Sequence, residues 1–301
     1  MEKTVVLDGK SSPKTKNYLS IHKKKTRVSD NLLYVLIYLS ASISVILLIG
    51  IIGYVFAKGI SRVSWSFLTS VTSALKGTTG IAGNILNTIY IILLTLLVAA
   101  PVGIGSAIYL NEYAKPGKIV KIIEFTTETL SGIPSIVFGL FGLAFFVVFL
   151  KLGWCILSGG LVLALMAIPT IFQVAEVTLT SIPNSYKEGS YGLGATKWQV
   201  IYSVILPAAL PGIITGVILA MTRAISEAAA VMYAVGSALT VPISIFDPGR
   251  PLPLHLYVLA TEGVSLQNAY GTAAVLVIIV LILTVATNLI VERYQKKIMG
   301  K

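Results

Sequence analysis

The chain has 301 residues, of which 55% are hydrophobic and only 12% are charged. A soluble domain has about twice that share of charged residues, and a disordered chain is far less apolar, so both classes are excluded. The formal net charge of +11 could suggest a nucleic-acid partner. The lysines and arginines, however, gather between apolar stretches and at both ends of the chain, as they do in membrane proteins.

The first 30 residues are strongly basic. They contain eight lysines and arginines and lack the apolar run of a cleavable signal peptide. The sequence therefore predicts a flexible cytoplasmic tail over residues 1–30 and a transmembrane domain over residues 31–301.

Six stretches are apolar and long enough, or nearly so, to cross a membrane, which takes about 20 residues. The third becomes apolar only after a polar segment near Glu124. The stretches cover about residues 32–56, 85–109, 136–150, 155–179, 210–233 and 273–291. The pattern predicts an all-α membrane protein with six transmembrane helices.

The distribution of lysine and arginine predicts the orientation of these spans. With the N-terminus in the cytosol, 17 of the 23 basic residues lie on the cytosolic side, five lie outside, and Arg223 lies within a span. Without the N-terminal tail the split is still nine to five. Basic residues concentrate on the cytosolic side of membrane proteins, so both termini are predicted to be cytoplasmic.

Two connections are longer than a simple turn between helices requires. In this topology, residues 181–209 form a cytoplasmic loop and residues 237–270 an external one. The external loop contains four prolines, which disfavour a regular helix over its whole length. A re-entrant segment and a packed cap are both compatible with that pattern.

The cytoplasmic loop has the pattern of two short helices joined by a glycine turn. Pro183 ends the preceding span, and Asn184 or Ser185 is expected to cap the first helix. Gly192 and Gly194 then end that helix and supply the backbone freedom for a turn.

The second helix of the loop is predicted to begin at Thr196, and Pro207 and Pro211 mark the return to the membrane. Aromatic and charged residues are common at binding hot spots. We therefore interpret the loop either as a surface that binds a partner or as an ordinary loop with an interfacial tryptophan. Its aromatic and charged residues include Tyr186, Lys187, Glu188, Tyr191 and Trp198.

This loop resembles the EAA signature of permeases from binding-protein-dependent ABC importers. The signature has a glutamate followed by two small residues, a downstream glycine and a closing aliphatic-x-Leu-Pro. The matching residues are Glu188, Gly189, Ser190, Gly194, Val204, Leu206 and Pro207. The sequence departs from the signature at Gly189 and Ser190, which replace alanine, and at Val204, which replaces isoleucine.

The resemblance implies a type I ABC importer permease, with the importer core over about residues 80–295. In that family the short helix docks in a groove of a cytosolic ATPase, and ATP-driven closure of two ATPases moves the permease helices. Glu188 would then hold the turn and the contact, and Gly194 would permit the bend.

Other segments resemble the permeases of the phosphate importer, those of the PstA type in particular, and several are shared with the PstC type. They are Ala107–Ala114, Thr129–Phe141, Leu206–Gly216 and Leu252–Tyr257. The resemblance implies a PstC-like second permease, two PstB-like cytoplasmic ATPase subunits, a PstS-like external phosphate-binding protein and membrane lipid as partners, and no nucleic acid.

Arg223 is the residue most suited to an oxyanion, because its guanidinium fork can bind phosphate oxygens in two places. It is predicted near the middle of the fifth span, where an arginine needs a partner or a wet cavity. Glu227 lies one turn later on the same helical face. The pair is interpreted either as a site that phosphate meets in transit or as a closed structural ion pair.

The run Ser226–Ala230 departs from the phosphate permeases, which usually have Gly-Glu-Thr here and a proline soon after. The glutamate is kept, but the threonine hydroxyl and the proline kink are absent.

Residues 129–135 are a second candidate lining of the pathway. Thr129, Ser131 and Ser135 offer hydroxyl groups. Gly132 and Pro134 interrupt the helix and free backbone groups, which a membrane protein tolerates only within protein or along a water-filled cavity.

No nucleotide-binding pattern occurs, so the chain is expected to be a non-catalytic subunit that binds no cofactor, with ATP and Mg on the partner ATPases. The single cysteine, Cys155, and two distant histidines predict neither a disulfide nor a metal site. Two alternatives stay open: a PstC-type partner permease or a permease for another oxyanion (molybdate or sulfate), and an ion-coupled secondary transporter that uses Arg223 and Glu227.

Overall fold

The computed structural model describes residues 28–73 and 78–298 of the chain. The predicted basic tail lies almost entirely outside the described residues. The chain divides into two units, Met1–Ile52 and Gly53–Lys301, and each is described by itself.

Helix α1 (Val28–Gly59) accounts for the described part of the first unit. Its side chains are apolar on all sides, as expected of a helix surrounded by lipid. The hydroxyls of Ser40 and Ser44 donate to the carbonyls of Ile37 and Ser40, so these polar groups are satisfied within the helix. The first predicted span, 32–56, lies within this helix and is confirmed.

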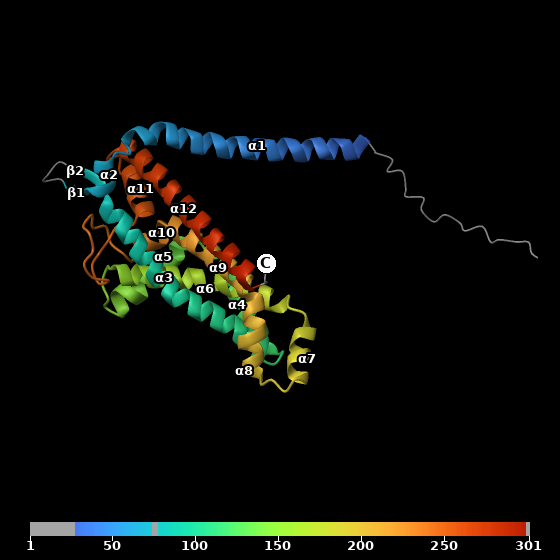
Figure 1. Ribbon diagram of the computed structural model, residues 1–301. Helices are drawn as coiled ribbons and strands as arrows, with labels where there is room; N and C mark the ends of the chain where they lie inside the picture. The colour runs from blue at the N-terminus through green and yellow to red at the C-terminus, as the bar shows by residue number, and fades with distance from the viewer. Residues whose placement is uncertain (1–27, 74–77, 299–301) are drawn as a thin grey trace, which may run out of the picture. The chain divides into compact units, whose positions relative to one another are not determined.

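The second unit is a bundle of helices with one small hairpin (Figure 1). The hairpin pairs β1 with β2 in antiparallel fashion, with Val71 opposite Ile81. The elements are η1 (Ile60–Arg62), α2 (Trp65–Thr69), β1 (Val71–Ser73), β2 (Thr78–Ile81), α3 (Ala82–Ile108), η2 (Tyr109–Tyr113), α4 (Lys118–Ser131), α5 (Ser135–Gly142), η3 (Leu143–Phe149), α6 (Ile156–Thr180), α7 (Asn184–Gly192), α8 (Lys197–Val200), η4 (Ile201–Ile205), α9 (Leu206–Ser226), α10 (Ala229–Met232), α11 (Leu252–Thr261) and α12 (Leu266–Ile298).

Among the described residues, five helices are long and apolar enough to cross a membrane, and a bent pair could supply a sixth. The five are Asn31–Arg62, Ala82–Tyr113, Ile156–Thr180, Lys197–Ser226 and Leu266–Arg293. The bent pair consists of Lys118–Ser131 and Ser135–Phe149, whose axes differ by 101°. The predicted all-α membrane fold is therefore confirmed, with the third span broken.

The break in the third span follows from its sequence. Pro134 cannot donate a backbone hydrogen bond, and it disfavours helical geometry at the preceding Ile133. The helix accordingly ends at Ser131 and restarts at Ser135. The predicted interruption by Gly132 and Pro134 is confirmed, and its result is a sharp bend.

The fifth predicted span, 210–233, is wrong at both ends. The continuous helix runs over Lys197–Ser226, so Pro207 and Pro211 lie inside it and do not mark its start. The π-helical turn η4 directly precedes Pro207. Its wider turn accommodates a proline ring that would otherwise clash with the carbonyl four residues earlier.

Helix α9 ends at Ser226 even though the chain lacks the proline that the phosphate permeases place nearby. Glu227 is extended, with φ −78° and ψ 123°, and the short α10 follows. Ala230 and Val231 of α10 are fully buried in the core. Tertiary packing therefore overrides the helical preference of the alanine run.

Helix α6 is the centre of the second unit and packs mainly against α3 and α9. Glycines permit the close approach. A Cβ at Gly103 of α3 would lie 2.9 Å from Cβ of Ile171, and a Cβ at Gly216 of α9 would lie 2.9 Å from Cβ of Val174. Small residues at such contacts let helix backbones pack closely in membranes.

The long connection before α11 packs onto the helix ends beneath it. The side-chain amide of Asn84 donates to the carbonyl of Arg250 at 2.7 Å, and the backbone N–H of Leu252 donates to the hydroxyl of Thr88 at 2.9 Å. At the start of α6, the N–H of Ile156 donates to the carbonyl of Asp247 at 3.0 Å. The connection is thus packed against the bundle, and it leads into α11, a short apolar helix of ten residues.

Replacing Gly103 with alanine is predicted to destabilise the second unit by about 1–3 kcal/mol, because overpacking of a tight contact forces the neighbours apart. Gly105→Ala is the matched control on the same helix, since a Cβ there meets nothing within 4 Å. An alanine inside a helix is favoured over glycine by about 0.5–1 kcal/mol. Thermal unfolding in detergent measures both changes, and equal melting temperatures would contradict the packing argument.

Candidate functional site

The loop after α6 begins with a short helix whose start differs from the prediction. Neither Asn184 nor Ser185 caps helix α7; Asn184 is already its first residue, and Pro183 occupies the cap position without a side-chain hydrogen bond. The carbonyl of Pro183 accepts the N–H of Tyr186 at 3.1 Å and so opens the helix. The predicted side-chain cap is therefore wrong, although the helix itself is present.

The turn between α7 and α8 is closed by backbone groups. Gly194 has a φ of 83°, a conformation that glycine adopts readily and most other residues avoid. The N–H of Gly194 donates to the carbonyl of Tyr191 at 2.9 Å, and the N–H of Ala195 donates to the carbonyl of Ser190 at 3.1 Å. These bonds satisfy carbonyls that the end of α7 would otherwise leave free.

Helix α8 begins where the sequence predicts. The hydroxyl of Thr196 accepts from the N–H of Gln199, and the side chain of Gln199 accepts from the N–H of Thr196 at 2.8 Å. This reciprocal pair is a capping box, which fixes a helix start. From here the helix continues into the long span that ends at Ser226, so the loop is joined rigidly to a transmembrane helix.

The outer surface of the loop is rich in exposed aromatic and apolar side chains. Leu193, at the turn, is 91% exposed. Glu188 is also exposed, and among the described residues it forms no ion pair. The other large exposed side chains are Tyr186, Tyr191, Trp198 and Tyr202. Such a surface is typical of a contact with another protein.

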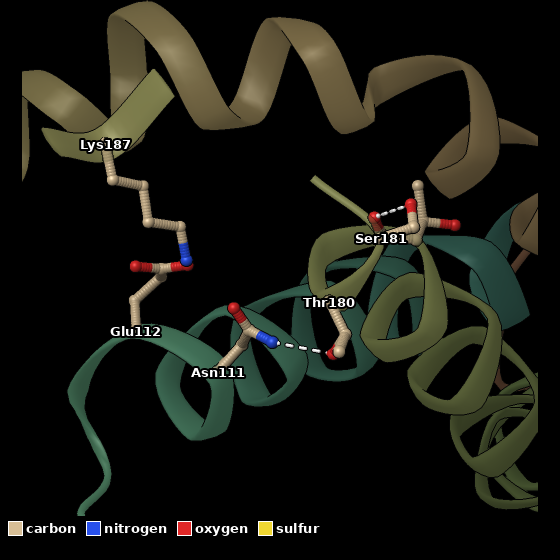
Figure 2. A network of polar contacts seen from close by, with 6 residues as sticks. Asn111, Glu112, Thr180, Ser181 and Lys187 are labelled. Carbon is tan, nitrogen blue, oxygen red and sulfur yellow. Dashed lines mark hydrogen bonds and ion pairs between the residues drawn. The ribbon is translucent and has the colours of Figure 1, made fainter. Parts of the chain in front are cut away.

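The inner side of the loop is tied to the end of the span that contains α3. Lys187 Nζ lies 2.6 Å from Glu112 Oε1, and the Glu112 side chain is only 5% exposed (Figure 2). Asn111 donates from Nδ2 to the hydroxyl of Thr180 at 2.9 Å. These contacts link π-helix η2 to α7 and to the end of α6.

A third contact from η2 reaches the start of α8, where Lys197 Nζ lies 4.7 Å from the centre of the Tyr113 ring. In the sequence, residues 111–113 stand out only as part of a family resemblance, and no role was predicted for them. A polar run directly after an apolar span was the available signal, but it does not identify the partner residues.

Arg223 and Glu227 lie at the far end of the helix Lys197–Ser226, which corresponds to the fifth predicted span, and not near its middle. Arg223 is in the last turn of α9, roughly 40 Å along the helix from Lys197 at 1.5 Å per residue. Its Nε lies 3.9 Å from Glu227 Oε1, an ion-pair distance that is too long for a hydrogen bond. Leu163 and Met166 of α6 lie beside the pair, around a space of about 10 Å³.

Two of the three candidate hydroxyl groups at the break of the third span donate to backbone carbonyls of their own helix. Thr129 donates to the carbonyl of Phe125 and Ser131 donates to that of Glu128, each at 2.7 Å. Ser131 also accepts from Gln173 at 3.4 Å, whereas Ser135 begins helix α5. Among the described residues, no hydrogen bond or ion pair joins this group to Arg223 or Glu227. The two candidate groups do not form one polar network, although Leu130 and Ile133 pack against the apolar cluster that contains Ala224, next to Arg223.

Gly194→Ala is predicted to destabilise the turn by about 1–2 kcal/mol, because a side chain opposes the left-handed conformation. Gly189→Ala is the matched control, since Gly189 is helical and a Cβ there meets nothing within 4 Å. Amide hydrogen exchange over residues 184–196 measures the effect. Faster exchange is expected for Gly194→Ala only; equal exchange in both variants would contradict it.

Comparisons with known proteins cover most of the chain. The chain is 34% identical over 288 residues to the probable ABC transporter permease protein YqgI of Bacillus subtilis, covering 90% of this chain and 98% of that protein. It is 29% identical to the phosphate transport system permease protein PstA 1 of Mycobacterium tuberculosis strain H37Rv, with 88% of each covered. It is 31% identical to the permease protein PstC of Pasteurella multocida, with 71% of this chain and 75% of that protein covered.

The fold has counterparts among solved structures. The crystal structure of a bacterial alginate ABC transporter, in complex with an alginate-bound periplasmic protein, contains a chain that matches with a TM-score of 0.65 at 17% identity. The match covers 89% of this chain and 96% of that one. The family model of the binding-protein-dependent transport system inner membrane component matches residues 99–300. The chain therefore belongs to this family of ABC importer permeases, as a multi-pass protein of the inner membrane.

Proposed function

We propose that this permease moves inorganic phosphate across the cytoplasmic membrane and that its loop 181–209 couples it to the ATPase subunits. The observation that carries the coupling role is the two-sided construction of the loop. Exposed aromatic residues and Glu188 form the outer face, and the inner face is tied to η2 through Lys187. The residues proposed for coupling are Glu188, Gly189, Ser190, Gly194, Leu206 and Pro207.

The exposure of Arg223 and its distance from Glu227 support an anionic cargo. Its side chain is 42% exposed, whereas that of Glu227 is only 16% exposed. Their separation of 3.9 Å keeps the charges together without a direct hydrogen bond, so the guanidinium N–H groups are available to an oxyanion. Thr129, Ser131 and Ser135 contribute polar groups at a second point of the proposed pathway.

The names of several relatives support phosphate as the cargo, since PstA and PstC proteins are described as phosphate transport permeases. The proposed assembly contains a PstC-like second permease, two PstB-like ATPases and a PstS-like external binding protein. ATP and Mg would bind to the ATPases, and this chain is proposed to bind no cofactor. Because PstC also matches at 31% identity, the alternative is that this chain takes the PstC place.

Uptake by proteoliposomes tests the proposal. Phosphate entry is expected to require the ATPases, a second permease, the external binding protein and ATP. Sulfate and molybdate serve as competitors, and co-expression with a PstA-like or a PstC-like chain shows which place this subunit takes. Phosphate uptake by this chain alone, driven by an ion gradient, would refute the proposal.

Glu188→Lys is predicted to lower ATPase co-purification by at least tenfold and to leave membrane insertion intact. Truncation or reversal at a contact hot spot costs about 2 kcal/mol or more, which is a factor of about 30. The matched control is Glu262→Lys, which reverses an exposed carboxylate next to α11. Capture of the ATPase at the normal level by Glu188→Lys would refute a docking role for this residue.

Arg223→Ala is predicted to abolish phosphate uptake while the complex still assembles, because the proposed pathway then has no guanidinium for the anion. Arg223→Lys keeps the charge but not the fork and is expected to retain partial uptake. Radiolabelled phosphate uptake and co-purification are measured together. Uptake at the normal level in Arg223→Ala would show that the arginine is merely structural.

A further inference from the structure

We propose that Glu112 is a positioning residue that transmits motion from helix α7 to the span containing α3 through its ion pair with Lys187. The proposal rests on the coupling role proposed above for the loop, but not on the identity of the cargo. The Glu112–Lys187 contact lies on the side of the loop that faces the membrane helices, away from the proposed docking surface.

The ion pair differs from an ordinary surface salt bridge. The Glu112 side chain is 5% exposed and that of Lys187 is 19% exposed, with 2.6 Å between the charged atoms. Exposed pairs are weak because water screens them and the side chains stay mobile. A pair shielded from water interacts more strongly, and either charge is costly to leave alone. The contact is therefore a firm link between α7 and η2.

The position of the Lys187–Glu112 ion pair also distinguishes it from the other polar contacts of α7. Among the hydrogen bonds and ion pairs of the described residues, it is the one that joins a side chain of α7 to a membrane-spanning segment. The remaining bonds of α7, such as Ser190 to the carbonyl of Tyr186, lie within the loop. A force applied to the exposed face of α7 therefore reaches the α3 span through Lys187 and Glu112.

The two neighbours of Glu112 brace the loop on either side of α7. Asn111 holds Thr180 at the end of α6, and Tyr113 lies under Lys197 at the start of α8. All three residues belong to π-helix η2, where the wider turn changes the direction of successive side chains. Three consecutive residues thus contact the chain before, within and after α7, and Figure 2 shows the contacts of the first two, Asn111 and Glu112.

Distance measurements between spin labels test the link without knowledge of the cargo. Labels are placed at exposed Leu193, in the loop, and at exposed Val102, on α3, in a Cys155→Ser background of the assembled complex. In the complex with Glu112 and Lys187 intact, the distance between the two labels is expected to have one narrow distribution, both with and without nucleotide. Glu112→Gln and Lys187→Met are expected to broaden it.

The double exchange Glu112→Lys with Lys187→Glu is the decisive variant, since it restores opposite charges and conserves the summed length of the two side chains. It is expected to narrow the distribution again. Glu262→Gln, a neutralised exposed carboxylate, is the control and is expected to change nothing. Narrow distributions in both single variants, or a broad one in the double exchange, would overturn the proposal.

Coupling is then measured as phosphate taken up per ATP hydrolysed. Each single variant is expected to lower this ratio at least tenfold while the ATPases still co-purify, and the double exchange is expected to restore it. An unchanged ratio, or loss of the ATPases from the single variants, would overturn the transmitting role. A wild-type complex that imports no phosphate would refute the proposed cargo alone, because the label distances do not depend on it.

If a single variant does not fold, Glu112→Cys with Lys187→Cys replaces the ion pair by a cleavable thiol cross-linker in the Cys155→Ser background. Here the spin labels at positions 193 and 102 are attached to a ketone-bearing amino acid, so that the linker alone uses thiols. The narrow distance distribution and the normal uptake ratio are expected with the linker intact and are expected to be lost when it is cleaved. Equal results before and after cleavage would overturn the proposal.

Discussion

The close packing of α6 between α3 and α9 is the constraint on which the second unit depends. All three helices carry glycine or alanine where their backbones meet, and bulkier residues at Gly103 or Gly216 would collide with α6. Within lipid there is no hydrophobic effect to drive helices together, so dispersion contacts at short range supply much of the stability. This packing also sets the positions of both candidate sites, because the loop leaves the end of α6 and Arg223 rests against its side.

The coupling loop has an outer surface that is free for a partner and an inner surface that contacts the membrane domain. Its backbone is closed by Gly194 and by the capping box of Thr196, so the loop does not need its side chains to keep its shape. The outward side chains are then free for a partner, while Lys187 turns inward to Glu112. Because α8 continues without a break into α9, movement of the loop is conveyed to the membrane both by a covalent helix and by a polar contact.

Most of the fold could be predicted from apolar length, and the errors have local physical causes. The residues before Pro207 are apolar, but Pro207 and Pro211 suggested a boundary there. The structure instead inserts a π-helical turn and continues the helix from Lys197. At the other end, the alanines after Glu227 have high helical preference, but burial of α10 ends α9 at Ser226.

The candidate site was predictable only where its residues lie close together in sequence. The pattern of residues located the loop, its glycine turn and the start of its second helix at Thr196, but not the capping box there. Glu112 and Lys187 are 75 positions apart, and neither stands in a pattern that names the other. The position of Arg223 in the last turn of α9 likewise depends on where that helix begins and ends, which the sequence did not place correctly.

The central claim is that loop 181–209 is the surface that binds the ATPase, and site-specific photo-cross-linking tests it most directly. A photoreactive residue at Leu193, which is 91% exposed in the turn, is compared with one at Val264, which is 65% exposed at the opposite, predicted external side. Irradiation of the assembled complex is predicted to attach the ATPase at position 193 and not at position 264. Absence of an ATPase adduct at position 193, or equal adducts at both positions, would contradict it.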